Sequence, residues 1–120
     1  MLKISVNEWL DWETKEANLF ICDNDIRFTV FCPQYVGLES QEIMLQSLYT
    51  NDVVLTFDKP MIKKDGAGFY SYIVVGKVSS ITPPCVELTD AITIELDSPL
   101  PGDIQKGQNV QFYTERLSLD

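Results

Sequence analysis

The chain has 120 residues, of which 45% are hydrophobic and 22% charged, a balance that fits one globular domain and excludes disorder as its main state. It contains 18 acidic and 9 basic residues and no histidine, which gives a formal net charge of −9. This charge repels nucleic acid and anionic membranes and favours encounter with basic partners. With no apolar stretch near the ~20 residues needed to span a bilayer and no signal-peptide region, we expect a cytoplasmic protein without nucleic-acid or membrane partners.

The first expected elements are a short helix and a β-hairpin. Asn7 can cap a helical turn over residues 8–12, with acids in the first turn as the helix dipole prefers. Apolar runs at residues 19–22 and 25–32 flank an Asp/Asn cluster, which is typical of a hairpin turn. The second run alternates, so the sequence predicts a strand with these side chains on its inward face: Ile26, Phe28, Val30 and Cys32.

A second helix and another strand are expected in the middle of the chain. Ser40 can cap a helix over residues 41–49, although residues 43–45 could equally begin a strand. The helical face would carry Leu45, Leu48 and Tyr49. Residues 53–57 predict a strand with alternate apolar side chains inward, namely Val53, Leu55 and Phe57.

The last third of the chain is rich in strand signals. A long β-rich run over residues 69–81 contains Gly76, which predicts a bulge or bend. Residues 85–88 and 92–96 flank a short turn and predict a second hairpin. The final strand, residues 110–119, is expected to turn these side chains inward: Val110, Phe112, Leu117 and Leu119.

These elements predict one mostly β domain over residues 1–120. The expected architecture is a β-barrel or β-sandwich of about seven or eight antiparallel strands with one or two short helices. Because strands and helices do not alternate repeatedly, a doubly wound α/β sheet is not expected.

The chain has three cysteines, Cys22, Cys32 and Cys85, and no pair has CxxC spacing. This usage predicts buried, reduced thiols in a cytosolic protein. A disulfide between Cys22 and Cys32 is the alternative.

The missing histidine removes most catalytic chemistry. There is no Ser-His or Cys-His pair, no HExxH zinc motif, no GxxxxGK[ST] phosphate loop and no GxGxxG after a strand. We therefore expect no metal site and no cofactor. Paired carboxylates can still perform acid–base catalysis, and the candidate pairs are Asp23 with Asp25, Glu95 with Asp97, and Asp11 with Glu13. Turn formation and solvation explain these acids more simply, so we expect that the protein is not an enzyme.

Residues 101–110, PGDIQKGQNV, resemble the turn-and-strand entry of biotinyl and lipoyl carrier domains. In that family a lysine a few residues later bears the cofactor, whereas this chain has Ser118 near that place. The resemblance implies a turn entering a strand and does not support a carrier function.

Acidic residues gather in two segments, residues 8–25, where Lys15 is the one base, and residues 78–105, which contain no base. If the segments meet in the fold, they form one negative face. Trp9 and Trp12 lie in the first segment, either as core residues that close the barrel or as interface anchors among charges. The expected partner-binding residues are Trp9, Asp11, Trp12, Glu13, Glu16, Asp23, Asp25, Glu87, Asp90, Glu95 and Asp97.

In small size, acidity and lack of a catalytic set, the chain is similar to immunity proteins of bacterial toxin–immunity systems, including contact-dependent growth inhibition. That resemblance implies an inhibitor that neutralises a basic toxin enzyme, such as a nuclease, by occluding its active site. The alternative is a non-catalytic β-barrel accessory or assembly module of a larger complex, in which acidity serves only solubility.

Overall fold

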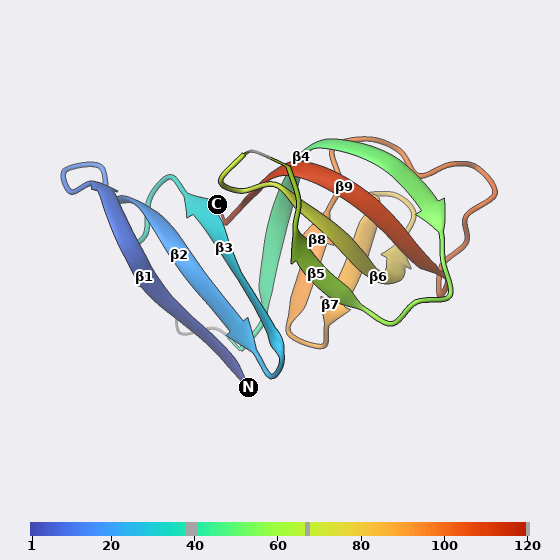
Figure 1. The fold of residues 1–120 in the computed structure, drawn as a ribbon, viewed down its shortest axis with the longest axis horizontal. Helices are drawn as coiled ribbons and strands as arrows, with labels where there is room; N and C mark the ends of the chain where they lie inside the picture. Colours follow the sequence, from blue (N-terminus) through green and yellow to red (C-terminus); the bar gives the residue numbers. More distant parts are fainter. Residues whose placement is uncertain (38–40, 67, 120) are drawn as a thin grey trace.

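Nine β-strands make up the ordered elements of the computed structural model, which describes residues 1–37, 41–66 and 68–119 (Figure 1). In chain order they are β1 (Leu2–Asp11), β2 (Glu16–Asp23), β3 (Ile26–Cys32), β4 (Ile43–Leu55), β5 (Met61–Lys64), β6 (Tyr72–Ser80), β7 (Cys85–Thr89), β8 (Ile92–Glu95) and β9 (Asn109–Ser118). They form one sheet in the order β1-β2-β3-β9-β4-β8-β7-β6-β5. A further pairing of β9 with β6 closes β9-β4-β8-β7-β6 into a barrel, so the mostly β prediction is confirmed.

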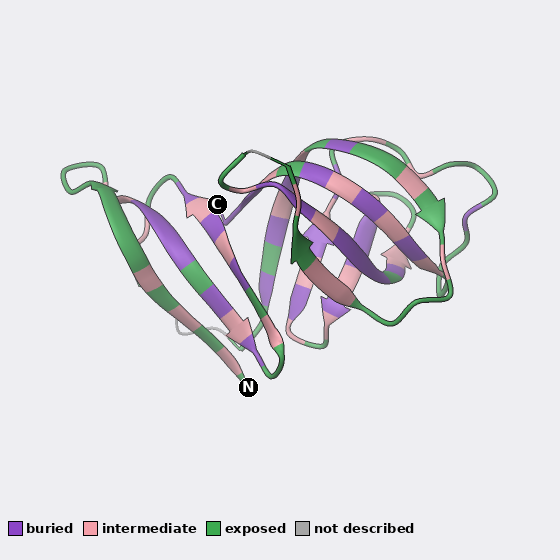
Figure 2. Ribbon diagram, in the orientation of Figure 1, coloured by how far each residue is buried: buried purple, intermediate pink, exposed green. Residues whose placement is uncertain are grey.

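β1, β2 and β3 form an antiparallel meander beside the barrel, at the left of Figure 1. Alternate side chains of β2, such as Leu19 and Ile21, belong to the same buried cluster as Ile94 and Phe112 of the barrel. Figure 2 shows this alternation as purple bands along β2 and β9. Meander and barrel therefore share one continuous core. Each apolar side chain that is fully buried in it stabilises the fold by roughly 1.5–3 kcal/mol.

The outer edge of β3 is paired with a strand at one point and bonded to a tyrosine side chain at another. β3 pairs with β9 only where Phe31 faces Ser118. Farther along this edge, the buried Tyr72 of β6 accepts a hydrogen bond from the Thr29 amide at 2.9 Å and donates one to the Thr29 carbonyl at 3.0 Å. The ring of Tyr72 packs edge-on against Phe28, with centroids 6.0 Å apart. One phenol thus satisfies the backbone groups that a neighbouring strand would otherwise pair.

Strand β6 changes its neighbour at Gly76. Residues 72–75 pair with β5 and residues 77–80 with β7, while the ladder to β9 runs through residues 72–77 without a register shift. A Cβ at Gly76 would lie 2.5 Å from Val86 Cγ1 and 2.7 Å from the Glu87 carbonyl oxygen. The glycine therefore allows β7 to approach β6 closely and does not mark a bulge in the ladder to β9.

Two strand pairings depart from the predicted antiparallel sheet. Residues 43–46 of β4 run parallel to β8, and β3 runs parallel to β9 at a single residue pair. Parallel neighbours need a long connection, and three strands, β5, β6 and β7, separate β4 from β8 in the chain. Alternation within a strand gives no information about such distant pairing.

Both predicted helices are wrong, and the described residues contain no helix. Residues 8–11 end β1, and residues 43–49 belong to β4. Over residues 43–49 the buried side chains are Ile43, Leu45 and Ser47, a period of two, whereas Tyr49 is exposed. The proposed cap Ser40 lies outside the described residues.

Both predicted hairpins are confirmed, because β2 pairs with β3 and β7 pairs with β8 in antiparallel register. Asn24 in the first turn has a φ of 54°, a left-handed conformation that asparagine tolerates. The predicted inward face of β3 is buried at Phe28, Val30 and Cys32, and that of β9 is also confirmed. Residues 53–57 differ: Leu55 and Phe57 are exposed, because this end of β4 extends beyond the core.

The register excludes a disulfide between Cys22 and Cys32. Cys22 lies opposite Arg27 near the turn of the β2–β3 hairpin, and Cys32 lies opposite Ala17 at the other end. Five residue steps along the hairpin separate the two levels by roughly 16 Å, far beyond the reach of a disulfide. Cys32 and Cys85 are buried, as predicted.

Substitution Gly76→Ala should strongly destabilise the barrel, because the added methyl group overlaps Val86 and the Glu87 backbone. We expect the free energy of unfolding to fall by about 1–3 kcal/mol, measured by urea denaturation. Gly102→Ala is the control, since a Cβ there meets nothing within 4 Å. Equal stability of the Gly76→Ala protein and the parent would contradict the close approach of β7.

Candidate functional site

The acids expected to form one face lie instead in three places. Residues 9–16 form the tip of the β1–β2 hairpin, where Asp11 pairs with Glu16. Asp23 lies opposite Leu2 at the other end of the same hairpin. Along β2 it is seven residue steps, or roughly 23 Å, from Glu16 at the tip. The acids of residues 87–97 belong to the β7–β8 part of the barrel and the loop that follows it.

The hairpin tip projects from the side of the meander away from the barrel (Figure 1). The Asp11 carboxylate accepts hydrogen bonds from the backbone amides of Glu13 at 2.9 Å and Thr14 at 3.3 Å, which shapes the turn. Lys15 has a φ of 66°, and its carbonyl accepts a hydrogen bond of 2.9 Å from the Tyr35 amide. The tip is therefore ordered by local bonds and by one contact to the chain after β3.

An aromatic cluster lies on this tip. The rings of Trp9 and Trp12 meet edge-to-face with centroids 4.9 Å apart, and Tyr35 lies 6.3 Å from Trp9. The Lys15 ammonium lies 3.4 Å from the centre of the Trp12 ring. Trp12 is 63% exposed and Trp9 38%, so neither closes the barrel as a core residue. A largely exposed tryptophan of this kind is typical of a binding surface.

Carboxylates surround the cluster. Asp11 and Glu13 are exposed, and Glu16 is half-buried. The Glu8 carboxylate accepts a hydrogen bond of 3.3 Å from the side-chain amide of Asn18. Asn18 is buried, and its side-chain oxygen accepts a hydrogen bond from the Tyr70 hydroxyl. Four acids against the single base Lys15 give the tip a net negative charge.

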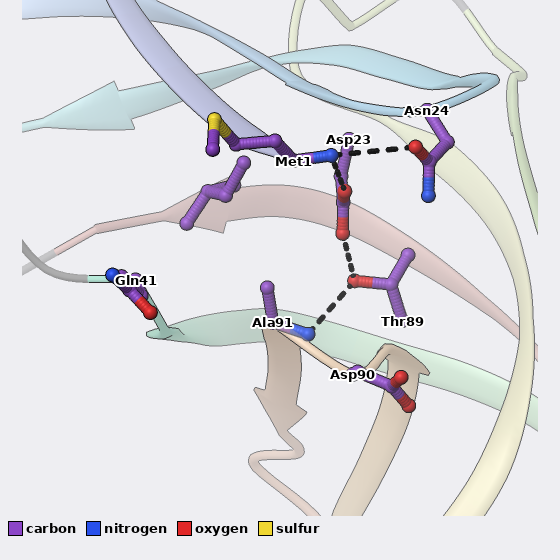
Figure 3. Close-up of a pocket in the computed structure, with 8 residues that line it drawn as sticks. Met1, Asp23, Asn24, Gln41, Thr89, Asp90 and Ala91 are labelled. Carbon is purple, nitrogen blue, oxygen red and sulfur yellow. Dashed lines mark hydrogen bonds and ion pairs between the residues drawn. The ribbon is translucent and has the colours of Figure 1, made fainter.

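The second group lines a pocket of about 540 Å³ between the meander and the barrel (Figure 3). Its lining residues are Met1, Leu2, Asp23, Asn24, Gln41, Thr89, Asp90 and Ala91. The buried Asp23 carboxylate accepts a hydrogen bond of 2.6 Å from the Thr89 hydroxyl and lies 3.2 Å from the Met1 amino group. Asp23 and Asp90 are thus brought together from the two acidic segments, but Asp23 joins β2 to the β7–β8 turn and is not available to a partner. Asp25 is exposed in the adjacent turn.

The third group has local roles in the barrel. Glu87 lies opposite Lys77 in the β6–β7 ladder, and Lys106 lines the same surface depression. Glu95 and Asp97 line another depression beside Pro84. Two lysines therefore lie near Glu87 and reduce the negative charge of this part of the surface.

Asp97 holds the bend of β4. Its carboxylate accepts hydrogen bonds from the Tyr49 amide at 2.6 Å and the Thr50 amide at 3.1 Å, where Tyr49 has a φ of 57°. Burial alone would raise the pKa of Asp97, but the hydrogen bonds from Thr50 and Tyr49 favour the charged form and lower the pKa below its ordinary value. The two carboxylates of the predicted pair, Glu95 and Asp97, therefore have different surroundings, because the Asp97 carboxylate is bound to backbone amides of β4.

Sequence reasoning identified the two tryptophans and the acids of the tip but missed Tyr35 and the position of Lys15. Tyr35 comes from beyond β3, and no local pattern indicates its contact with Trp9. The sequence does show Lys15 as the one base among these acids, three residues after Trp12. That spacing was the signal that could have indicated the contact of Lys15 with Trp12.

Within the described residues, no three His, Cys, Asp or Glu side chains gather closely enough to hold a metal ion. The same part of the chain has no helix that is long and apolar enough to cross a membrane. Comparison with family models, with curated proteins and with solved structures finds no significant match for this chain.

Replacing Asp97 by alanine should destabilise the fold in a pH-dependent way. Because the folded-state pKa is lowered, the carboxylate stabilises the fold above its ordinary pKa of about 3.9, and this contribution disappears as the pH falls through the lower folded-state value. We expect a loss of about 1 kcal/mol at pH 7, since Asp97 is exposed and solvent screens its charge.

Urea unfolding at pH 7 and at pH 2 to 3 measures this difference, and the exposed Asp103→Ala is the control for removing a neighbouring charge. A deficit of Asp97→Ala that stays constant over this pH range would show that the charge of Asp97 does not contribute.

Proposed function

We propose that this protein is a small cytoplasmic inhibitor of the immunity type, which binds a basic toxin enzyme through the tip of its β1–β2 hairpin. The observation that supports this proposal is the exposed Trp12, beside Trp9 and among acidic side chains, on a segment that projects from the fold. The protein acts by occlusion and not by catalysis.

The chemistry of the tip fits a basic enzyme. Nucleases grip phosphates with lysine and arginine side chains, and carboxylates such as those of Asp11 and Glu13 can pair with these cations. Tryptophan supplies a large apolar contact at little conformational cost, which is why it dominates interface energetics. A narrow hairpin can also enter a cleft that the barrel is too wide to enter.

The charge of the whole chain assists encounter. A net charge of −9 attracts a basic enzyme over a distance of about one Debye length, near 8 Å at physiological salt. The attraction acts on the association rate and weakens as salt rises. The aromatic contact then determines how long the complex lasts.

A second candidate function is an accessory or assembly module, and one surface favours it. The end of β4 and the segment just after it expose Val54, Leu55 and Phe57, and Phe57 has no cover from the described residues. These apolar side chains lie on the barrel, away from the hairpin tip. Binding through them would be insensitive to salt.

Variants of the two surfaces distinguish these functions. With the protein as bait in a lysate of its native cell, Trp12→Ala should weaken capture of a basic enzyme by at least about thirtyfold, as loss of a hot-spot tryptophan does. Phe57→Ala removes an exposed aromatic ring from the segment just after β4 and should leave capture unchanged. Salt at about 0.5 M should also weaken binding.

Inhibition completes the test. The parent protein and Phe57→Ala should suppress the activity of the captured enzyme, and Trp12→Ala should not. A partner that is acidic, that resists salt, or that is lost with Phe57→Ala and retained with Trp12→Ala would refute the inhibitor and favour the assembly module.

A further inference from the structure

The face of Trp12 is already covered by a cation from the same chain. The Lys15 ammonium lies 3.4 Å from the centre of the Trp12 ring and 5.7 Å from that of Trp9. An ammonium over an indole face within about 6 Å is attracted by the negative ring face. The two rings and the ammonium therefore form an occupied cation site that is open to solvent.

The Lys15 ammonium contacts the aromatic rings and not the acids of the tip. Among the described residues, no carboxylate lies within ion-pair distance of the Lys15 ammonium. Asp11 uses its side chain to bind the amides of Glu13 and Thr14. The ammonium thus lies on the aromatic face in a negative environment, with the surrounding charges unpaired.

The backbone of Lys15 is held by a hydrogen bond, whereas its ammonium contacts only the two rings and forms no ion pair among the described residues. A φ of 66° and the hydrogen bond from the Tyr35 amide define where the main chain lies. The long side chain beyond it can swing away without changing the turn. The ring face can therefore be vacated and filled again while the hairpin stays folded.

We propose that the Trp9–Trp12 pair is a binding site for a lysine or arginine side chain of the partner, and that Lys15 occupies this site in the free protein. The inference rests on the proposed function and names the group that the tip recognises. On binding, an ammonium or guanidinium group of the partner replaces the Lys15 ammonium on Trp12, and the displaced lysine returns to solvent.

Because Lys15 occupies the site in the free protein, a cation must displace it in order to bind. A single dissolved cation gains little by replacing Lys15, because it exchanges one cation–π contact for another. A partner with several basic groups also pairs with the carboxylates around the rings, so it outcompetes the tethered lysine. The site thereby favours a basic protein surface over isolated ions.

Removing Lys15 tests the competition. Lys15→Asn vacates the ring face and keeps the turn, because asparagine tolerates a positive φ. The probe is a tetra-arginine peptide amide, titrated at low salt. Binding is followed by intrinsic tryptophan fluorescence, which reports on this cluster alone because Trp9 and Trp12 are the two tryptophans of the chain.

The matched control separates occupation from charge. Thr14→Glu lowers the charge of the tip by one unit, as Lys15→Asn does, but leaves Lys15 over the ring. Lys15→Arg keeps both the charge and the contact, so it should bind the peptide as the parent does. We expect Lys15→Asn to bind about two- to fivefold more tightly than Thr14→Glu, the factor that an exposed cation–π contact supplies.

Each outcome decides one claim. Peptide binding by Lys15→Asn that is no tighter than binding by Thr14→Glu overturns the competition, and the proposed function still stands if Trp12→Ala loses the captured enzyme. If Trp12→Ala retains that enzyme, the proposed function fails whatever the peptide shows. A gain in Lys15→Asn together with loss of the enzyme by Trp12→Ala supports both.

Discussion

The hydroxyl group of Tyr72, bonded to both backbone groups of Thr29, joins the two parts of this fold. β3 meets the barrel strand β9 at one residue pair, so the rest of its outer edge depends on this phenol and on the apolar contacts below it. Burial raises the pKa of Tyr72, so the group stays protonated and can donate to the Thr29 carbonyl throughout the physiological range. Together with the shared core and the hydrogen bond from Thr89 to Asp23, this junction fixes the position of the meander on the barrel.

The position of the meander determines what the hairpin exposes. Because β2 and β3 pack on the barrel, β1 lies at the outer edge of the sheet and pairs only with β2 in the described part of the chain. The turn that joins β1 to β2 projects away from the barrel (Figure 1), and Trp9 and Trp12 beside it are exposed. The fold thus presents an aromatic and acidic tip, which is the arrangement that an occluding inhibitor needs.

Local patterns in the sequence predicted local structure well. Period-two alternation and turn residues predicted both hairpins and the buried faces of β3 and β9. Helices were predicted wrongly at residues 8–12 and 41–49, because a polar cap with apolar residues spaced three or four apart also fits a strand that ends at a turn or bends. Strand pairing between distant segments, such as β4 with β8, leaves no local signal.

The candidate site was predictable to the same extent. Trp9 and Trp12 among acids were recognisable from the sequence, and their edge-to-face contact follows from the hairpin turn. The expectation of one acidic face failed, because the register places Asp23 at the opposite end of the hairpin from Asp11 and binds its carboxylate to Thr89. Which carboxylates stay available depends on hydrogen bonds that only the folded chain defines.

The most direct test of the central claim is the amide and indole NMR spectrum of the protein with and without its captured enzyme. Trp9 and Trp12 are the two tryptophans, so the spectrum contains two indole N–H signals that report on the tip. Both signals should shift or broaden on binding, while the amides around Phe57, just after β4, stay unchanged. Unchanged indole signals together with shifts around Phe57 would contradict binding through the hairpin tip.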